Sequence, residues 1–197
     1  MTKRIILAAF VAILAAPAAS QAVAPPAASV PNDDLVRIAF DTDKGRIVVA
    51  LDRGRAPKTT ANFLAYVDKK WLDGQPFYRA MPMTGGGLIQ GGVRDGAKQL
   101  PPIATETSAM TGLKNVAGAI VMANAGPNST RSDFFILTSD VPSFDSTFAP
   151  FGRVVEGMEV VKAIFAAPRS PTRGEGVMKG QMLDPVVKIV KAARVKA

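Results

Sequence analysis

Hydrophobic and polar residues alternate over residues 36–40, and such alternation is typical of a half-buried β-strand. Residues 46–51 are again strand-like, rich in β-branched and apolar residues, and Asp41–Gly45 supplies a turn between the two stretches, so they predict a β-hairpin. Six later runs are rich in aromatic or β-branched residues and are bounded by Gly, Pro, Asn or Asp. These runs predict strands at 77–80, 88–91, 117–123, 134–138, 151–155 and 186–195.

Two other stretches place apolar residues at the spacing of a helix. Residues 56–67 carry Pro57 near the first turn and bring Phe63 and Tyr66 to one face, and residues 158–165 form the second stretch. Many short strands with only two helices argue against β-α-β units and predict a mainly-β fold, either an antiparallel barrel or a sandwich. A closed barrel leaves no strand edge exposed, which suits a secreted monomer.

The N-terminal residues have the pattern of a secretory signal peptide. Lys3 and Arg4 precede an uninterrupted apolar run over 5–16, and the small residues Ser20 and Ala22 predict cleavage after Ala22. A retained N-terminal anchor is the alternative, but the run is shorter than the roughly 20 residues of a spanning helix. We therefore expect no stable membrane insertion once the signal is removed.

The predicted organisation is a signal peptide over 1–22, a flexible Ala/Pro-rich linker over 23–34 and one domain over 35–197. An exported chain that contains no Cys fits the bacterial periplasm, where disulfides are permitted but not required. The sequence therefore predicts a periplasmic location.

Composition narrows the possible functions. The chain of 197 residues contains no His and no Cys, which excludes a Ser-His-Asp triad, a Cys nucleophile, an HExxH metal site and an iron–sulfur cluster. No motif indicates another metal or a cofactor. The formal net charge is +8, falling to +6 without Lys3 and Arg4, but the positive residues are scattered. Because no basic stripe with interleaved aromatic residues is present, we expect no nucleic-acid partner.

Several motifs share an order and spacing that run from about Val36 to Val195. The motifs are Ala-Pro-Lys-Thr-Thr-Ala-Asn-Phe at 56–63, Phe-Tyr-Arg at 77–79, Gln-Gly-Gly at 90–92, Met-Ala-Asn-Ala-Gly-Pro-Asn at 122–128, Ser-Asp-Phe-Phe-Ile at 132–136, Phe-Asp-Ser at 144–146 and Phe-Gly-Arg-Val-Val-Glu-Gly-Met at 151–158. Together they resemble the cyclophilin family of peptidyl-prolyl cis-trans isomerases. The resemblance covers nearly the whole predicted domain.

The resemblance implies a closed eight-stranded antiparallel β-barrel capped by two α-helices, with a substrate groove on the outside of the barrel wall. It also implies an isomerase that accelerates rotation about X-Pro bonds in polypeptides and assists protein folding. Such rotation crosses a resonance barrier of roughly 18–20 kcal/mol and needs no nucleophile, metal or net proton transfer. A guanidinium can donate hydrogen bonds at any physiological pH, so an enzyme without His or Cys can perform this reaction.

The residues matched to the family motifs imply a site. By this resemblance Arg79 is the catalytic arginine, and Gln90 supports it and contacts the substrate backbone. The backbone of Ala123 and Asn124 binds the residue before the proline, and Phe135 is the floor of the proline pocket. The remaining implied pocket residues are Leu88, Phe144 and Phe148.

Some positions depart from the family pattern. Tyr78 and Phe148 stand where the family has histidines, and Asp133 stands where it has glutamine. Ser143 stands where the family often has tryptophan, so we expect weaker binding of the family's cyclic-peptide inhibitor. The connection over 82–89 is about three residues longer than in the family.

In this longer connection Gly87 takes the place of a pocket phenylalanine, and Met83 is the candidate to fill that place. We therefore expect a shallower pocket. The altered connection over 82–89 favours a second hypothesis, a cyclophilin-fold chaperone or peptide-binding module with little or no isomerase activity, whereas the retained Arg79 and Gln90 favour the enzyme. A third hypothesis is an unrelated barrel that binds a small ligand.

Overall fold

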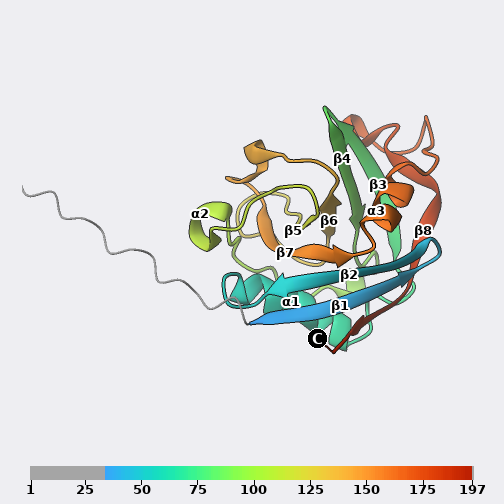
Figure 1. Cartoon of the computed structure of the whole chain (residues 1–197). Coiled ribbons are helices and arrows are strands. Elements are labelled where there is room, and N and C mark those ends of the chain that lie inside the picture. Colours follow the sequence, from blue (N-terminus) through green and yellow to red (C-terminus); the bar gives the residue numbers. More distant parts are fainter. Residues whose placement is uncertain (1–33, 197) are drawn as a thin grey trace, which may run out of the picture.

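The computed structural model describes residues 34–196, which form one closed β-barrel (Figure 1). The predicted signal peptide over 1–22 and the linker residues 23–33 lie outside the described residues. Asp34, the last residue of the predicted linker, is described and forms an ion pair with Arg53, which lies beside it at the open end of the first hairpin. Within residues 34–196, no helix combines the length and apolar character needed to cross a membrane.

The eight predicted strands are all present. They are β1 (Leu35–Thr42), β2 (Gly45–Asp52), β3 (Pro76–Met83), β4 (Gly86–Gly91), β5 (Ala119–Met122), β6 (Phe134–Leu137), β7 (Ala149–Glu156) and β8 (Met182–Arg194). Their order around the barrel is β1-β2-β7-β5-β6-β4-β3-β8, every neighbouring pair is antiparallel, and β8 closes the sheet against β1. The predicted closed eight-stranded antiparallel barrel is therefore confirmed.

The described residues contain three α-helices rather than two. The two predicted helices are α1 (Pro57–Asp68) and α3 (Met158–Phe165), and the third, α2 (Ser108–Thr111), lies between β4 and β5, where no helix was predicted. A helix of one turn is too short to show a 3.6-residue period, which explains why the sequence did not reveal it. Short 3₁₀ turns occur at Gly96–Lys98 (η1), Pro142–Phe144 (η2) and Gly176–Met178 (η3).

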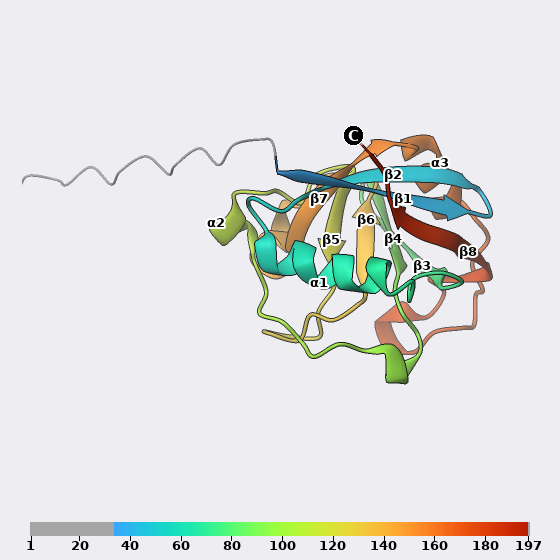
Figure 2. The same cartoon turned by 90° about the horizontal axis from the view of Figure 1, so that it is seen from below.

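The interior of the barrel is packed with phenylalanine rings. Phe134 on β6 lies at the centre of this group, with ring centroids 5.5 Å from Phe40 and 5.2 Å from Phe63. Phe77 and Phe151 complete the group, and all five side chains are fully buried. Helix α1 packs against β2, β7 and β8, whereas α3 packs against β2, β3 and β4, and Figure 2 shows α1 lying across the barrel. Both helices thus cover the aromatic core.

A second apolar cluster lies on the outer side of the barrel wall. Successive side chains of a strand point to opposite faces, so Phe134 enters the core while its neighbour Phe135 faces outward. Phe135 joins Leu88, Val121 and Leu137 in this outer cluster, which is separate from the main core. The cluster forms an apolar surface next to β3 and β4, and it positions the candidate site.

The long connection between β3 and β4 is a regular hairpin. The ladder pairs Met83 with Gly86, so the strands extend to a turn at 84–85, where Gly85 has a φ of +79°. The two strands therefore extend beyond the predicted 77–80 and 88–91, because continued strand pairing satisfies the backbone polar groups of the connection. The register also shifts between Phe77 and Arg79, and this bulge lets both Tyr78 and Arg79 reach the outer side.

Candidate active site

The guanidinium of Arg79 is held by an extensive set of hydrogen bonds. Arg79 lies directly opposite Gln90 in the β3–β4 ladder, and its Nη1 donates to Gln90 Oε1 at 2.9 Å. From the other side, Gln181 Oε1 accepts from Arg79 Nε at 2.9 Å and from Nη2 at 2.6 Å. The sulfur of Met81 accepts from Nη2 at 2.9 Å. Burial lowers the pKa of Arg79, but an arginine stays protonated in proteins.

Three aromatic rings lie together in the outer cluster. The centroid of the Phe135 ring is 5.9 Å from Phe144 and 5.3 Å from Phe148, and the Phe144 and Phe148 rings are 4.7 Å apart. All three contacts are edge-on, which is a favourable arrangement of aromatic pairs. Leu88 packs in the same cluster, so four of the predicted pocket residues are brought together.

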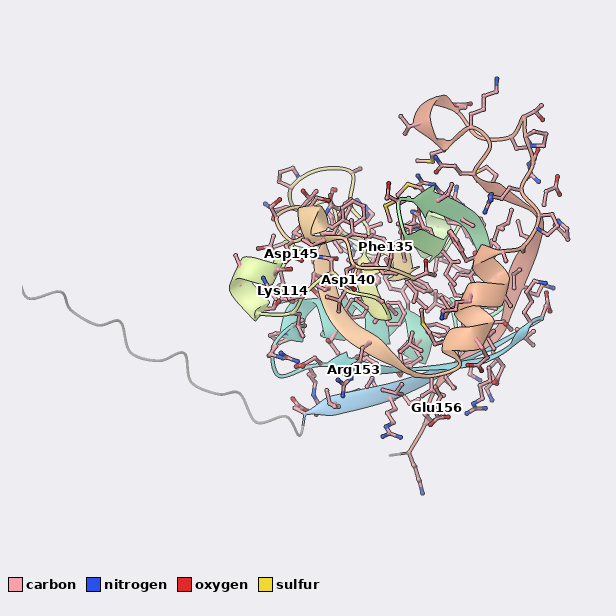
Figure 3. All side chains as sticks on the ribbon, turned by 45° about the horizontal axis from the view of Figure 1, so that its top comes forward. Lys114, Phe135, Asp140, Asp145, Arg153 and Glu156 are labelled. Carbon is pink, nitrogen blue, oxygen red and sulfur yellow. The ribbon has the colours of Figure 1, made fainter. Side chains whose placement is uncertain are left out.

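The segment that carries Phe144 is anchored by its neighbour Asp145. The Asp145 carboxylate accepts hydrogen bonds from Ser108 Oγ and from the backbone and side chain of Asn115, and it pairs with Lys114 at 3.2 Å (Figure 3). Burial raises the pKa of Asp145, but the hydrogen bonds from Asn115, Lys114 and Ser108 outweigh it and lower the pKa to about 2. The aromatic wall is therefore fixed to the segment around α2.

Met81 and Met83 also pack against the outer cluster, and the sequence had indicated only Met83. Residues 79, 81 and 83 share one face of β3 because strand side chains alternate. At Gly87, by contrast, a Cβ would lie 2.1 Å from the carbonyl oxygen of Met81 and 2.6 Å from the Phe165 ring. Position 87 therefore has no room for a side chain, and methionines from the opposite strand supply the apolar surface.

A cavity of about 510 Å³ opens beside Gln90. Ala123 and Asn124, both predicted to bind substrate backbone, line it together with Arg94 and Asp133. The N–H of Ala123 donates to the carbonyl oxygen of Asp133 at 2.9 Å. The Asn124 side chain donates to the carbonyl oxygen of Thr147 at 2.8 Å. This cavity thus continues the groove from Gln90 toward the 123–129 segment.

Tyr78 forms a compact polar group with Asp133 and Arg94 at the edge of this cavity. Its hydroxyl donates to Asp133 Oδ2 at 3.0 Å, while the Arg94 guanidinium lies 4.5 Å from the centroid of the Tyr78 ring. Burial raises the pKa of Tyr78, and burial also raises the pKa of Asp133. Tyr78 and Asp133, which both depart from the family pattern, therefore satisfy each other's polar groups through one hydrogen bond.

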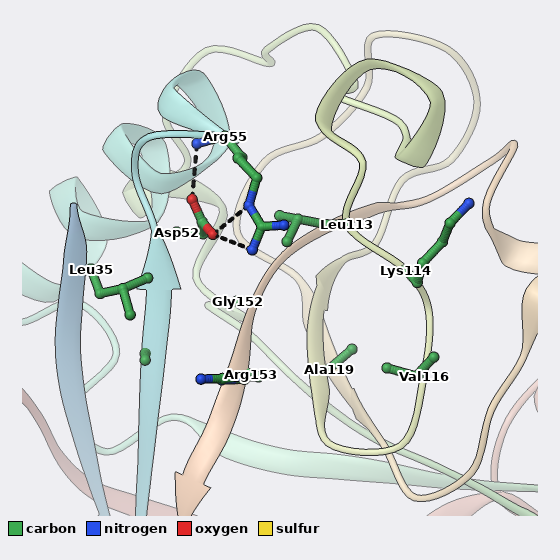
Figure 4. Close-up of a pocket in the computed structure, with 10 residues that line it drawn as sticks. Leu35, Asp52, Arg55, Leu113, Lys114, Val116, Ala119, Gly152 and Arg153 are labelled. Carbon is green, nitrogen blue, oxygen red and sulfur yellow. Dashed lines mark hydrogen bonds and ion pairs between the residues drawn. The ribbon is translucent and has the colours of Figure 1, made fainter. Parts of the chain in front are cut away.

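A smaller cavity of about 170 Å³ lies elsewhere on the barrel and contains none of the predicted site residues (Figure 4). Leu35, Leu113 and Arg153 line it, and Arg55 donates to Asp52 at 2.7 Å at its edge. Among residues 34–196, no group of three or more His, Cys, Asp or Glu side chains is arranged to hold a metal ion. The Arg79 face, where the predicted site residues meet, is the candidate active site.

Comparison with known proteins places this chain in a family. Residues 36–193 match the family described as "Cyclophilin type peptidyl-prolyl cis-trans isomerase/CLD". The chain is 36% identical over 172 residues to "Peptidyl-prolyl cis-trans isomerase A" of Dickeya dadantii, a match that covers 83% of this chain and 85% of the relative. It is 34% identical over 164 residues to "Peptidyl-prolyl cis-trans isomerase-like 1" of Neurospora crassa, covering 81% and 94% of the two chains.

The fold is shared with solved structures of the same class. A crystal structure of a cyclophilin-type peptidyl-prolyl cis-trans isomerase from Cryptosporidium parvum superposes with a TM-score of 0.70 at 22% identity, covering 83% of this chain and 99% of that one. A second structure of that protein, determined in the presence of the dipeptide Ala-Pro, gives a TM-score of 0.69. With the family match spanning nearly the whole described barrel, the chain belongs to the cyclophilin-type peptidyl-prolyl cis-trans isomerases and is an isomerase.

Proposed function

We propose that this isomerase is exported to the bacterial periplasm and accelerates X-Pro isomerisation in flexible or folding polypeptides there. The observation that carries this proposal is the half-buried guanidinium of Arg79, which Gln90 holds at the border of an apolar, aromatic surface. A proline ring placed against Phe135 brings its own amide nitrogen toward that guanidinium. The Arg79 face thus offers an apolar surface for the proline ring and a fixed hydrogen-bond donor for the prolyl nitrogen.

The chemistry of the reaction matches this arrangement. Amide resonance holds the X-Pro bond planar, with a barrier of roughly 18–20 kcal/mol, and rotation interrupts this resonance. In the twisted state the prolyl nitrogen becomes pyramidal and can accept a hydrogen bond, which the planar amide nitrogen cannot do. A fixed guanidinium that donates to this nitrogen stabilises the twisted state more than either planar state, and this difference is catalysis.

One solved neighbour supports the substrate class. The Cryptosporidium parvum isomerase was crystallised in the presence of the dipeptide Ala-Pro, which contains the type of bond proposed as the substrate here. In this chain the apolar cluster of Leu88, Phe135, Phe144 and Phe148 supplies a surface for the proline ring. The adjoining cavity beside Gln90 supplies space for residues on one side of the ring.

Export is supported by the N-terminal sequence. Lys3 and Arg4, the apolar run over 5–16 and the small residues up to Ala22 have the composition of a secretory signal. Relatives from Dickeya dadantii and Streptomyces antibioticus support a bacterial setting. Expression of the full chain in a bacterium tests this proposal, since the periplasmic fraction should contain a form that begins at Val23. An uncleaved chain confined to the cytoplasm contradicts it.

A peptide-binding module with little catalysis is the second candidate function. It is favoured by the packing of Met81 and Met83 against the cluster, because these side chains occupy space beside Phe135. Such a module grips a Pro-containing segment without lowering the rotation barrier. The retained contact between Arg79 and Gln90 favours the enzyme.

Exchange spectroscopy separates the two candidates. The cis/trans exchange rate of a short X-Pro peptide is measured by NMR with the wild type, with Arg79→Ala, and with Arg153→Ala as a control in the smaller cavity, which contains no predicted site residue. We expect rapid exchange with the wild type and the control, and exchange close to the uncatalysed rate with Arg79→Ala. Peptide binding by the wild type without faster exchange supports the module instead.

A further inference from the structure

Arg79 is held from two sides, and the second holder, Gln181, was not indicated by the sequence motifs. Gln90 reaches the guanidinium from β4, whereas Gln181 reaches it from the residue that precedes β8. The Oε1 atom of Gln181 accepts from both Nε and Nη2, at 2.9 Å and 2.6 Å. Arg79 therefore depends on Gln181 for as many contacts as on all its other partners together.

The side chain of Gln181 is itself fixed in direction. Its Nε2 donates to the carbonyl oxygen of Val177 at 2.7 Å, so the Oε1 atom must point toward Arg79. The backbone of Gln181 is fixed as well, because its carbonyl oxygen accepts from the N–H of Ala80 at 2.9 Å. Its N–H donates to the carbonyl oxygen of Met178 at 3.1 Å. An amide flip at Gln181 would lose its bond to Val177 and both bonds to Arg79.

This arrangement leaves one N–H donor of Arg79 free for a substrate. An arginine has five N–H donors in a rigid plane, and Gln90, Gln181 and Met81 take four of those of Arg79. One Nη1 hydrogen remains. Because the partners are neutral, the guanidinium keeps its full positive charge, and a charged donor forms stronger hydrogen bonds than a neutral one. A carboxylate at either position would hold Arg79 equally well but would neutralise that charge.

We propose that Gln181 is a positioning residue of the isomerase, which fixes the plane of the Arg79 guanidinium and leaves its charge free to act on the prolyl amide. This inference rests on the catalytic role of Arg79 proposed above. It adds a requirement, namely that the residue at 181 must accept two hydrogen bonds and must be uncharged.

Two substitutions separate these requirements. Gln181→Met has a similar length but lacks the amide, whereas Gln181→Glu keeps an acceptor and adds a negative charge. For Gln181→Met we expect kcat to fall about tenfold or more with KM nearly unchanged, because a poorly oriented donor loses transition-state binding only. The Nε–H resonance of Arg79 in ¹⁵N NMR should shift and exchange faster with water. For Gln181→Glu the Nε–H resonance should stay protected while kcat remains low.

The control is Lys179→Met, which places the same side chain on an exposed neighbouring position and should leave kcat unchanged. Gln181→Asn, which withdraws the amide by one methylene, provides a second variant if Gln181→Met is unstable to heat. Wild-type kcat in both variants, or a rise in KM at constant kcat, overturns the inference. Wild-type kcat in Gln181→Glu overturns the requirement for a neutral residue.

Failure of the proposed function gives a different result. If the wild type itself does not accelerate exchange, the proposed role of Arg79 is wrong whatever Gln181 does. The Nε–H resonance still tests the positioning step in that case, because it reports the order of the guanidinium without any turnover. An Arg79 resonance that is identical in the wild type and Gln181→Met shows that Gln181 does not position it.

Discussion

The sulfur of Met81 lies 2.9 Å from Nη2 of Arg79, so a thioether lies between the guanidinium and the aromatic cluster. Both side chains project from the same face of β3, because they are two residues apart on a strand. A thioether is a weak acceptor and a flexible apolar group, which lets it contact both the cation and the rings. Gly87 on β4 contributes no side chain to the apolar surface. The methionines of the paired strand β3 supply that surface instead.

Substitution of Met83 tests whether the hairpin methionines form part of the substrate surface. We expect Met83→Ala to raise KM for an X-Pro peptide several-fold with little change in kcat, because the lost contact is present in ground and transition states alike. Removing this half-buried side chain should also lower the free energy of unfolding by about 1 kcal/mol. Met110→Ala, on a side chain that is 68% exposed, is the matched control. An unchanged KM in Met83→Ala contradicts the assignment.

The geometry of Arg79 predicts that its charge alone is not sufficient. Arg79→Lys keeps a positive charge, but an ammonium is a point charge and cannot bond Gln90 and Gln181 in one plane. We expect kcat/KM to fall by about 10²-fold, as for loss of one preorganised donor in other active sites. Steady-state rates on an X-Pro peptide provide the measurement, with Arg153→Lys as the control. Activity close to wild type in Arg79→Lys would show that fixed hydrogen bonds are unnecessary.

Much of the fold follows from local patterns that a sequence displays directly. The apolar, β-branched residues of β1 and β2 and the helical spacing of Phe63 and Tyr66 reflect burial in the barrel, so each predicted its element. The alternation of side chains along a strand places Phe134 in the core and Phe135 in the outer cluster. Extending it from Arg79 along β3 indicates Met81 as well, so this residue could have been found.

Other parts of the site depend on contacts between distant residues. Gln181 lies 102 positions from Arg79, in an irregular segment where no period relates it to the barrel. The hydrogen bond between Tyr78 and Asp133 joins residues that are 55 positions apart, so it is recognised only once both side chains are placed in the fold. The sequence therefore predicts which residues could act, whereas the closure of the barrel determines which of them meet.

The pair formed by Tyr78 and Asp133 predicts a change in titration. Burial raises the pKa of Asp133, and the Tyr78 hydroxyl opposes this by donating to the carboxylate. Tyr78→Phe removes that donor, so the pKa of Asp133 should rise further, which ¹³C NMR of the carboxyl carbon measures. A group with a raised pKa in the folded state destabilises the fold as pH rises through that pKa. The variant should therefore lose about 1 kcal/mol of stability at pH 7 and less at pH 4.

Tyr66→Phe serves as the control for this titration. The Tyr66 hydroxyl accepts from the backbone N–H of Leu100 and donates to no carboxylate among the described residues. The control should therefore lower the free energy of unfolding while leaving the midpoint of the Asp133 titration at its wild-type pH. If that midpoint does not move in Tyr78→Phe either, the hydrogen bond from Tyr78 to Asp133 is absent in solution.

The carboxylate of Asp145 predicts an acid-sensitive contribution to stability. Burial raises its pKa, but hydrogen bonds from Asn115, Lys114 and Ser108 lower the pKa to about 2. A group whose pKa is lower in the folded state stabilises the fold above its ordinary pKa, near 4, and loses this contribution as pH falls toward the folded value. Asp145→Asn should therefore reduce the free energy of unfolding by about 1–2 kcal/mol at pH 7, after allowance for partial exposure.

Denaturant titrations of wild type and Asp145→Asn at several pH values measure this contribution. The difference between the two proteins should be constant from pH 7 to about pH 5 and should shrink between about pH 4 and pH 2, where the wild-type carboxylate takes up its proton. Asp140→Asn is the control, because that carboxylate is exposed and, among residues 34–196, accepts from the N–H of Ala117 only. Since Asp145 anchors the segment carrying Phe144 and Phe148, its loss should also raise KM for an X-Pro peptide. A difference that does not depend on pH would show that the contribution of Asp145 does not arise from its ionised form.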